Sequence, residues 1–167
     1  PDGKRIAYSS SREFTSPAHI VVLDLGAAAA QRTLADADVG VSYRSPVFIA
    51  DSSTLAYARC TPKGCRIVRH DLEQGGEQVL VGDDHAPMPN FDVSADGRWL
   101  VYANMRRPQF PSGLALVDLA TGATRDLSLP DAGAGDDAMP RFSPDGSRIA
   151  YFRSAGGMQA LWTMDRD

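Results

Sequence analysis

Acidic residues gather in three short stretches of the sequence. They are Asp36-Ala37-Asp38, Asp83-Asp84-His85 and Asp136-Asp137, each a few residues before a proline. Carboxylates that lie close together repel one another unless water, a cation or a basic group neutralises them. Three interpretations stay open for this set, the acidic rim: solvated polar loops, a cation site, or a surface that binds a basic segment of a partner.

The two cysteines of the sequence, Cys60 and Cys65, bracket a turn that contains Pro62 and Gly64. Residues that face each other across such a turn can approach closely enough to form a disulfide. Two alternatives remain: a pair of inert thiols, and half of a zinc site that no neighbouring His or Cys completes. We favour the disulfide, which would indicate an oxidising compartment such as the periplasm.

Sequence motifs of well-known catalytic and cofactor sites are missing. The chain has no Gly-x-Ser-x-Gly, His-Glu-x-x-His, Gly-x-x-x-x-Gly-Lys or Gly-x-Gly-x-x-Gly segment. Its three histidines, His19, His70 and His85, are scattered along the sequence. We therefore expect no enzyme activity from this segment, no cofactor and no metal ion.

The composition is that of a compact globular chain. The net charge is −4, with 23% charged and 43% hydrophobic residues. This balance favours neither nucleic-acid binding nor disorder. No apolar stretch approaches the roughly 18 residues that a membrane-spanning helix needs, so we expect no membrane span in this segment.

The elements that must position these residues come from an internal repeat. A turn with an aspartate is followed by an apolar strand that ends in tyrosine, and the aspartates are 49, 45 and 49 positions apart. The repeats span about 1–44, 45–86, 87–137 and 138–167. The four copies are PDGKRIAY (1–8), ADSSTLAY (50–57), ADGRWLVY (95–102) and PDGSRIAY (144–151). A period of this length is typical of β-propellers and similar repeat folds.

Each repeat offers up to four short strands separated by turn residues. We therefore predict an all-β protein, a β-propeller of about four blades, each a four-stranded antiparallel sheet. Because side chains alternate along a strand, one apolar residue and the tyrosine of each copy should face the same way and pack between blades. These eight positions are Ile6, Tyr8, Leu55, Tyr57, Leu100, Tyr102, Ile149 and Tyr151.

The segment PRFSPDGSRIAYFRSAGGMQALWTMD (140–165) resembles the repeat of TolB-type propellers, also called WD40-like Pro-Asp repeats. All four copies share the resemblance, the fourth most closely and the second least, with Ser52 and Ser53 in place of glycine. Such repeats occur in periplasmic TolB, in the N-terminal propellers of prolyl oligopeptidase-like serine peptidases, and in sensor modules of membrane-anchored winged-helix regulators. Rings of this family usually have six or more blades, which implies that the chain is part of a six- to eight-blade ring.

The resemblance implies a noncatalytic, extracytoplasmic binding module that presents loops to a protein or peptide partner, as TolB or a regulator's sensor module does. The alternative is the gating propeller of a serine peptidase. We expect the first blade to lack its opening strand and the last its closing strand, which leaves an open arc. Further residues or a second copy in a homodimer would complete the ring. The acidic rim should then recur around one mouth of the central channel.

Overall fold

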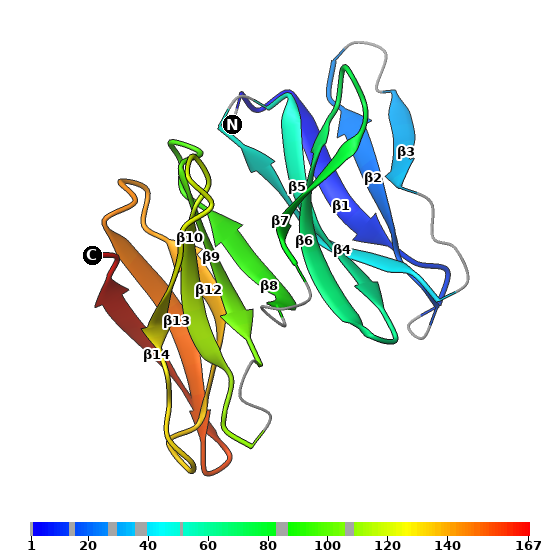
Figure 1. Cartoon of the computed structure of the whole chain (residues 1–167). Coiled ribbons are helices and arrows are strands. Elements are labelled where there is room, and N and C mark those ends of the chain that lie inside the picture. The colour runs from blue at the N-terminus through cyan, green and yellow to red at the C-terminus, as the bar shows by residue number, and fades with distance from the viewer. Residues whose placement is uncertain are drawn as a thin grey trace.

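The computed structural model describes residues 2–13, 16–26, 30–35, 40–50, 52–82, 87–105 and 109–167. These residues form four antiparallel sheets that follow one another in space in chain order (Figure 1). The first sheet consists of β1 (Arg5–Ser10), β2 (His19–Asp24) and β3 (Gln31–Ala35). The second consists of β4 (Ser42–Ile49), β5 (Thr54–Thr61), β6 (Gly64–Asp71) and β7 (Glu77–Val81).

The third sheet consists of β8 (Pro87–Val93), β9 (Trp99–Asn104), β10 (Gly113–Asp118) and β11 (Thr124–Ser128). The fourth consists of β12 (Asp136–Phe142), β13 (Arg148–Ala155) and β14 (Met158–Asp165). The two middle sheets thus have the predicted four strands, whereas the first and last have three. The second sheet begins at residue 42 and the fourth at residue 136, slightly before the repeat boundaries expected from the sequence.

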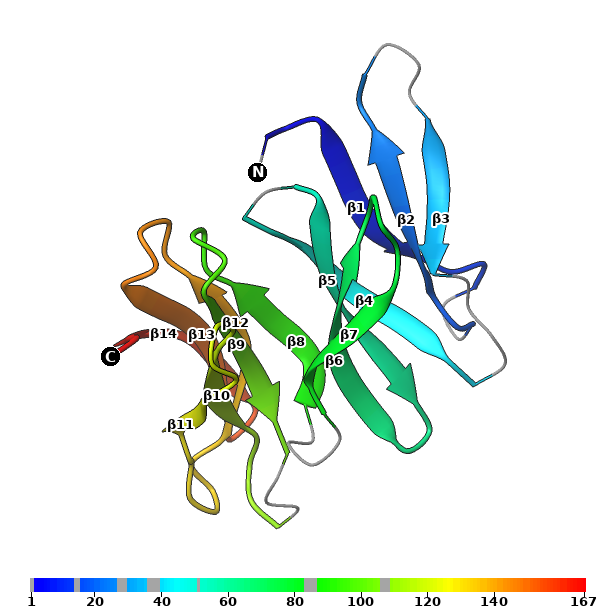
Figure 2. The ribbon, with the colours of Figure 1, turned by 45° about the horizontal axis from the view of Figure 1, so that its top comes forward.

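The sheets are arranged as an open arc. The first and fourth sheets lie at opposite ends of the molecule in both ribbon views (Figures 1 and 2). The first strands of the second, third and fourth sheets are neighbours, because β4 contacts β8 and β8 contacts β12. In the described part of the chain no helix exists that could cross a membrane.

The aspartate turns form because the carboxylate accepts hydrogen bonds from groups close to it in sequence. Asp96 Oδ1 accepts from the Arg98 backbone amide at 3.0 Å, and Asp145 Oδ1 accepts from the Ser147 amide at 3.1 Å. The glycines that follow have positive φ angles, 71° at Gly97 and 70° at Gly146. Such angles are reached easily only without a Cβ atom.

In the second copy Ser52 takes the glycine position and has the same type of backbone, with φ 61°. A side chain at this angle is unfavourable. The Ser52 hydroxyl offsets this backbone cost, because it accepts a hydrogen bond from the Asp2 backbone amide at 3.1 Å. The departure from the repeat therefore provides a contact between the first and second sheets.

Apolar cores fill the three junctions between neighbouring sheets. The junction of the second and third sheets holds Ala56, Ile67, Phe91, Leu100 and Tyr102, all 0% exposed. The junction of the first and second sheets includes Ile20, Val22, Leu55, Tyr57 and Val68. The junction of the third and fourth includes Val101, Ala103, Leu114, Leu116, Ile149 and Tyr151.

The prediction that eight repeat positions pack between blades is confirmed for six and wrong for two. Ile6 is 47% exposed and Tyr8 is only half-buried. Their neighbour Ala7 packs against the core shared with the second sheet. Because side chains alternate, Ile6 and Tyr8 belong to the opposite face of the first sheet. That face meets no other sheet of the described chain.

Candidate functional site

The structure describes two members of the acidic rim, Asp136 and Asp137. Asp36, Asp38, Asp83, Asp84 and His85 lie outside the described residues. The remaining two members, Asp136 and Asp137, were expected in a loop that leads into the fourth sheet. They instead form the first two residues of β12, and Asp137 is 0% exposed.

Asp137 is held by a dense set of hydrogen bonds. Arg153 donates from Nε to Oδ1 at 2.7 Å and from Nη2 to Oδ2 at 2.8 Å, while Ser128 Oγ donates to Oδ2 at 2.6 Å. The carboxylate raises the pKa of Arg153. The guanidinium carbon also lies 5.7 Å from the Tyr151 ring centre and 5.3 Å from that of Trp162. Asp137 and Arg153 thus form a bidentate pair at a buried position.

Asp136 and Asp137 join the third sheet to the fourth. Asp136 Oδ1 accepts from the backbone amide of Ser112 at 2.7 Å and from its hydroxyl at 3.1 Å. The Asp137 amide donates to the Ser112 carbonyl at 2.9 Å. The junction of the first and second sheets repeats this pattern: Ser42 Oγ accepts from the Ala18 amide at 3.1 Å, and the Tyr43 amide donates to the Ala18 carbonyl. These two aspartates therefore contribute to the packing of neighbouring sheets, and Asp137 is not a solvated rim residue.

The first strands of the sheets carry a polar contact that the sequence did not reveal. Asp92 Oδ2 accepts from the Phe142 backbone amide at 2.9 Å, and Arg141 Nη1 donates to the Phe91 carbonyl at 3.1 Å. Burial raises the pKa of Asp92. The two partners of each hydrogen bond lie 50 residues apart in the sequence. Only the packing of β8 beside β12 brings them together, so no local pattern could have identified them.

The structure contains the predicted disulfide. Cys60 and Cys65 face each other in the register of β5 and β6, with their Cα atoms 4.0 Å apart. Within the described residues, no group of three His, Cys, Asp or Glu side chains could hold a metal ion. His70 is half-buried in β6, and its ring centre is 6.5 Å from that of Tyr57.

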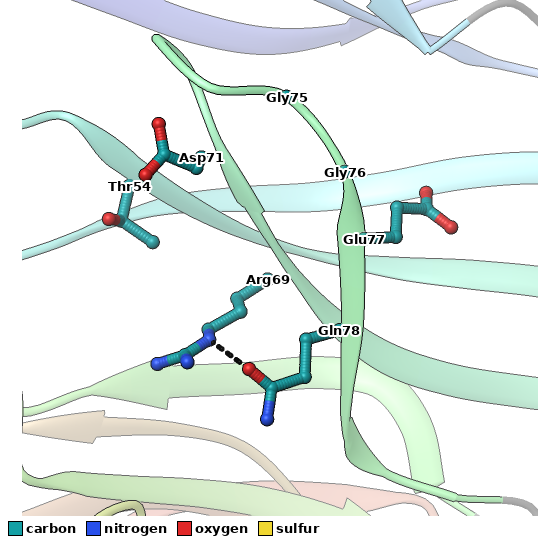
Figure 3. Close-up of a pocket in the computed structure, with 7 residues that line it drawn as sticks. All are labelled: Thr54, Arg69, Asp71, Gly75, Gly76, Glu77 and Gln78. Atoms are coloured by element: carbon teal, nitrogen blue, oxygen red, sulfur yellow. Dashed lines mark hydrogen bonds between the residues drawn. The ribbon is translucent and has the colours of Figure 1, made fainter.

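Tyr57 shows how the junction of the first and second sheets buries a polar group. Its hydroxyl donates to Glu77 Oε1 at 2.6 Å. Burial, followed by this hydrogen bond, raises the pKa of Tyr57. The tyrosine therefore stays neutral and acts as a hydrogen-bond donor inside the junction. Glu77 is otherwise exposed, and its side chain points away from Arg69 (Figure 3).

A polar groove made of two adjoining hollows extends from the second sheet to its junction with the third. One hollow of about 390 Å³ is lined by Thr54, Arg69, Asp71, Gly75, Gly76, Glu77 and Gln78 (Figure 3). Arg69 Nε donates to Gln78 Oε1 there at 2.8 Å. A neighbouring hollow of about 310 Å³ shares Thr54 and Arg69 and extends to Arg98 of the third sheet. The groove is thus lined by the guanidinium groups of Arg69 and Arg98 and by the Asp71 carboxylate, which accepts from the amides of its own turn.

The sequence matches no known protein family and no curated protein. Solved structures do resemble the fold. TolB from Acinetobacter baumannii superposes with a TM-score of 0.80 at 21% identity, over 100% of this chain and 39% of that one. A putative TolB from Agrobacterium tumefaciens gives 0.79 at 19% identity, over 99% of this chain and 59% of that one.

The chain folds as consecutive blades of a β-propeller. The same blades resemble part of a puromycin-hydrolysing peptidase from Mycobacterium tuberculosis, with a TM-score of 0.75 at 18% identity, over 99% of this chain and 26% of that one. The chain therefore spans less than two thirds of each of these proteins. The likeness establishes the propeller fold, which is shared by proteins of different functions.

Proposed function

We propose that these blades are a noncatalytic binding module that engages a protein or peptide partner. The observation that carries this proposal is the polar groove, which runs from Asp71 and Arg69 of the second blade to Arg98 of the third. An extended peptide suits such a groove because its backbone and charged side chains can both find partners there. The likeness to TolB over the whole chain supports the same proposal.

We place this module outside the cytoplasm. The support is the disulfide between Cys60 and Cys65, because structural disulfides persist in oxidising compartments and are rare in the reducing cytosol. The resemblance of the repeat to that of periplasmic TolB points the same way.

The second candidate is a propeller that gates access to a separate peptidase domain. The likeness to the puromycin-hydrolysing peptidase favours it. In this case the hydrolysis would belong to residues outside this 167-residue segment, and the blades would filter substrates. The two candidates differ in whether a reactive serine accompanies the propeller in the intact gene product.

Two experiments test the proposal. In the first, the intact gene product is treated with a fluorophosphonate, which labels an activated serine. In the second, calorimetry measures the binding of partners to the 167-residue chain. Candidate partners are purified after capture from an extracytoplasmic extract. The binding module predicts no labelling and saturable binding of a purified partner. It also predicts weaker binding when Arg69 and Arg98 are replaced by glutamine.

Labelling of a serine outside the segment would instead support the gating propeller. Saturable binding that is unchanged in the Arg69→Gln/Arg98→Gln variant would show that the groove is not the binding surface. A matched control is Lys4→Gln/Arg12→Gln, which removes the same charge from exposed positions of the first blade.

A further inference from the structure

A hollow between the first and second blades is lined by charged groups of both signs. Its volume is about 330 Å³, and none of its lining residues belongs to the polar groove of the second and third blades. It is lined by the buried side chains of Val22 and Leu72 and by the charged side chains of Arg5, Asp24, Arg32 and Glu73. We call it the mixed-charge hollow, and the proposed function leaves it unassigned.

The second blade holds the two arginines at the mixed-charge hollow. Arg5 Nη1 donates to the Ser52 carbonyl at 3.4 Å, and Arg32 Nη2 donates to the Leu72 carbonyl at 3.2 Å. Both acceptors are neutral backbone groups, so they orient the guanidinium groups without cancelling their charges. A guanidinium has five N–H donors. Each arginine therefore keeps donors for a ligand beyond the one that it uses here.

Two turns position the carboxylates. Asp24 Oδ1 accepts from the Gly26 backbone amide at 2.9 Å, which leaves Oδ2 for another partner. The Glu73 backbone amide donates to Asp71 Oδ1 at 2.8 Å, so the backbone of Glu73 is fixed while its side chain is exposed. The mixed-charge hollow thus presents two carboxylates opposite two guanidinium groups.

The opposite charges of the hollow do not lock one another. Arg5 and Asp24 are direct cross-strand partners, but their hydrogen bonds lead elsewhere, to the Ser52 carbonyl and to the Gly26 amide. Attraction between charges that remain in contact with water is screened and contributes little to stability. A ligand that brings one positive and one negative group can therefore bind without first breaking a strong ion pair.

A similar corner recurs one blade further along the chain. Asp24 ends β2 and Asp71 ends β6, and each accepts from amides of the turn that follows. The strands β2 and β3 supply Arg32 to the mixed-charge hollow, and β6 supplies Arg69 to the polar groove. The repeat thus places an aspartate and an arginine together at successive blades, which suits one extended chain that crosses both.

We propose that the mixed-charge hollow binds an extended segment of the partner in which an acidic and a basic residue lie two positions apart. Such residues point the same way and are about 7 Å apart in an extended chain. The acidic side chain binds Arg5 and Arg32, because guanidinium groups form paired hydrogen bonds with carboxylates. The basic side chain binds Asp24 and Glu73. This inference rests on the proposed binding function and specifies the charge pattern of the partner at one place.

Two labelled peptides of the same composition test the proposal by fluorescence anisotropy on the 167-residue chain. Three repeats of Glu-Thr-Lys-Thr place glutamate and lysine on one side of an extended peptide, whereas three repeats of Glu-Lys-Thr-Thr place them on opposite sides. Threonine favours the extended conformation in both. The first peptide should bind roughly tenfold or more tightly, and the difference should shrink as salt is raised. Equal affinities would overturn the proposal.

Replacement of the arginines locates the binding. Arg5→Gln/Arg32→Gln should weaken binding of the first peptide roughly tenfold or more. Lys4→Gln/Arg12→Gln, which removes the same charge from exposed positions of the first blade, should keep most of the affinity. Equal affinity in these two variants would show that the peptide binds elsewhere and would overturn the proposal.

Replacement of the carboxylates gives a readout that does not depend on the contacts of the arginines with the second blade. Asp24→Asn/Glu73→Gln keeps an oxygen acceptor for the Gly26 amide and removes both negative charges. This variant should prefer a peptide of Glu-Thr-Gln-Thr repeats over the lysine-containing one, whereas the unmodified chain should show the opposite preference. The same preference in both proteins would mean that Asp24 and Glu73 do not bind the basic residue, and the proposal would be wrong.

These results separate the mixed-charge hollow from the proposed function. If a purified protein partner binds the chain with an affinity that Arg5→Gln/Arg32→Gln does not change, the binding module stands and the inference about the hollow is wrong. If the intact gene product instead carries a labelled serine, the binding module fails, whereas the two peptides of equal composition still decide whether the hollow recognises this charge pattern.

Discussion

In the third blade Leu100 and Tyr102 are both 0% exposed, whereas their counterparts in the first blade, Ile6 and Tyr8, are 47% exposed and half-buried. The two strands follow the same repeat pattern, an apolar residue two positions before a tyrosine, as RIAY in the first and WLVY in the third. The difference lies in what each strand faces, because the third blade packs between two others and the first has one neighbour in the described chain. The repeat thus encodes a face that is buried only where an adjacent blade covers it.

The largest expected effect comes from Tyr102→Ala. This side chain fills the junction of the second and third blades, so its removal should lower the free energy of unfolding by about 3 to 5 kcal/mol. Tyr8→Ala is the matched control, and we expect it to cost about 1 kcal/mol or less because the side chain is only half-buried. Chemical denaturation of both variants measures the difference. A similar loss in the two would mean that the open face of the first blade is covered in solution.

Asp137→Ala should have the next largest effect. It leaves Arg153 without its paired carboxylate at the junction of the third and fourth blades. Breaking a buried ion pair typically costs about 3 to 5 kcal/mol, and we expect about 2 to 3 kcal/mol because the Arg153 side chain is 26% exposed. Asp131→Ala, an exposed aspartate in the preceding connection, should change stability little. Thermal unfolding of the two variants decides whether this junction depends on the ion pair between Asp137 and Arg153.

The first blade and the junction at Asp137 also show what the sequence could reveal. The aspartate turns were predictable because each carboxylate bonds to an amide two residues away, as Asp96 does with Arg98. The strands, the repeat and the disulfide likewise follow from neighbouring residues. The role of Asp137 was not predictable, because Ser112 and Arg153 lie 25 and 16 residues away and meet it only through packing between blades and pairing of strands.

The open face of the first blade illustrates the same limit. The repeat predicts that Ile6 and Tyr8 are suited to burial, but burial requires a neighbour that the repeat cannot specify. For the acidic rim, the sequence identified residues of one type at similar positions. The structure describes two of them, and a carboxylate that pairs with arginine looks the same in the sequence as one that faces water.

Removal of the disulfide should have a smaller effect than either junction variant. Cys60→Ala/Cys65→Ala opens a loop with a sequence separation of only 5 residues, so the unfolded chain gains little freedom. We expect a loss of about 1 to 2 kcal/mol in the free energy of unfolding. Free-thiol titration of the unmodified protein under native and denaturing conditions should find none.

The smallest effect concerns a turn whose contacts are local and do not depend on any neighbouring blade. Hydrogen bonds from Ser143 and Ser147 lower the pKa of Asp145 to about 2, from its ordinary 3.8. Because the pKa in the folded protein is depressed, the ionised carboxylate stabilises the fold fully above pH 3.8, and this contribution is lost as the pH falls through about 2. Asp145→Asn should therefore be slightly less stable than the parent at neutral pH, and the difference should vanish toward pH 2. Unfolding curves recorded across this range test the sign. If the parent is still more stable than Asp145→Asn near pH 2, the charge of the carboxylate does not stabilise the turn. The turn would then depend on packing, as the position of Tyr102 does.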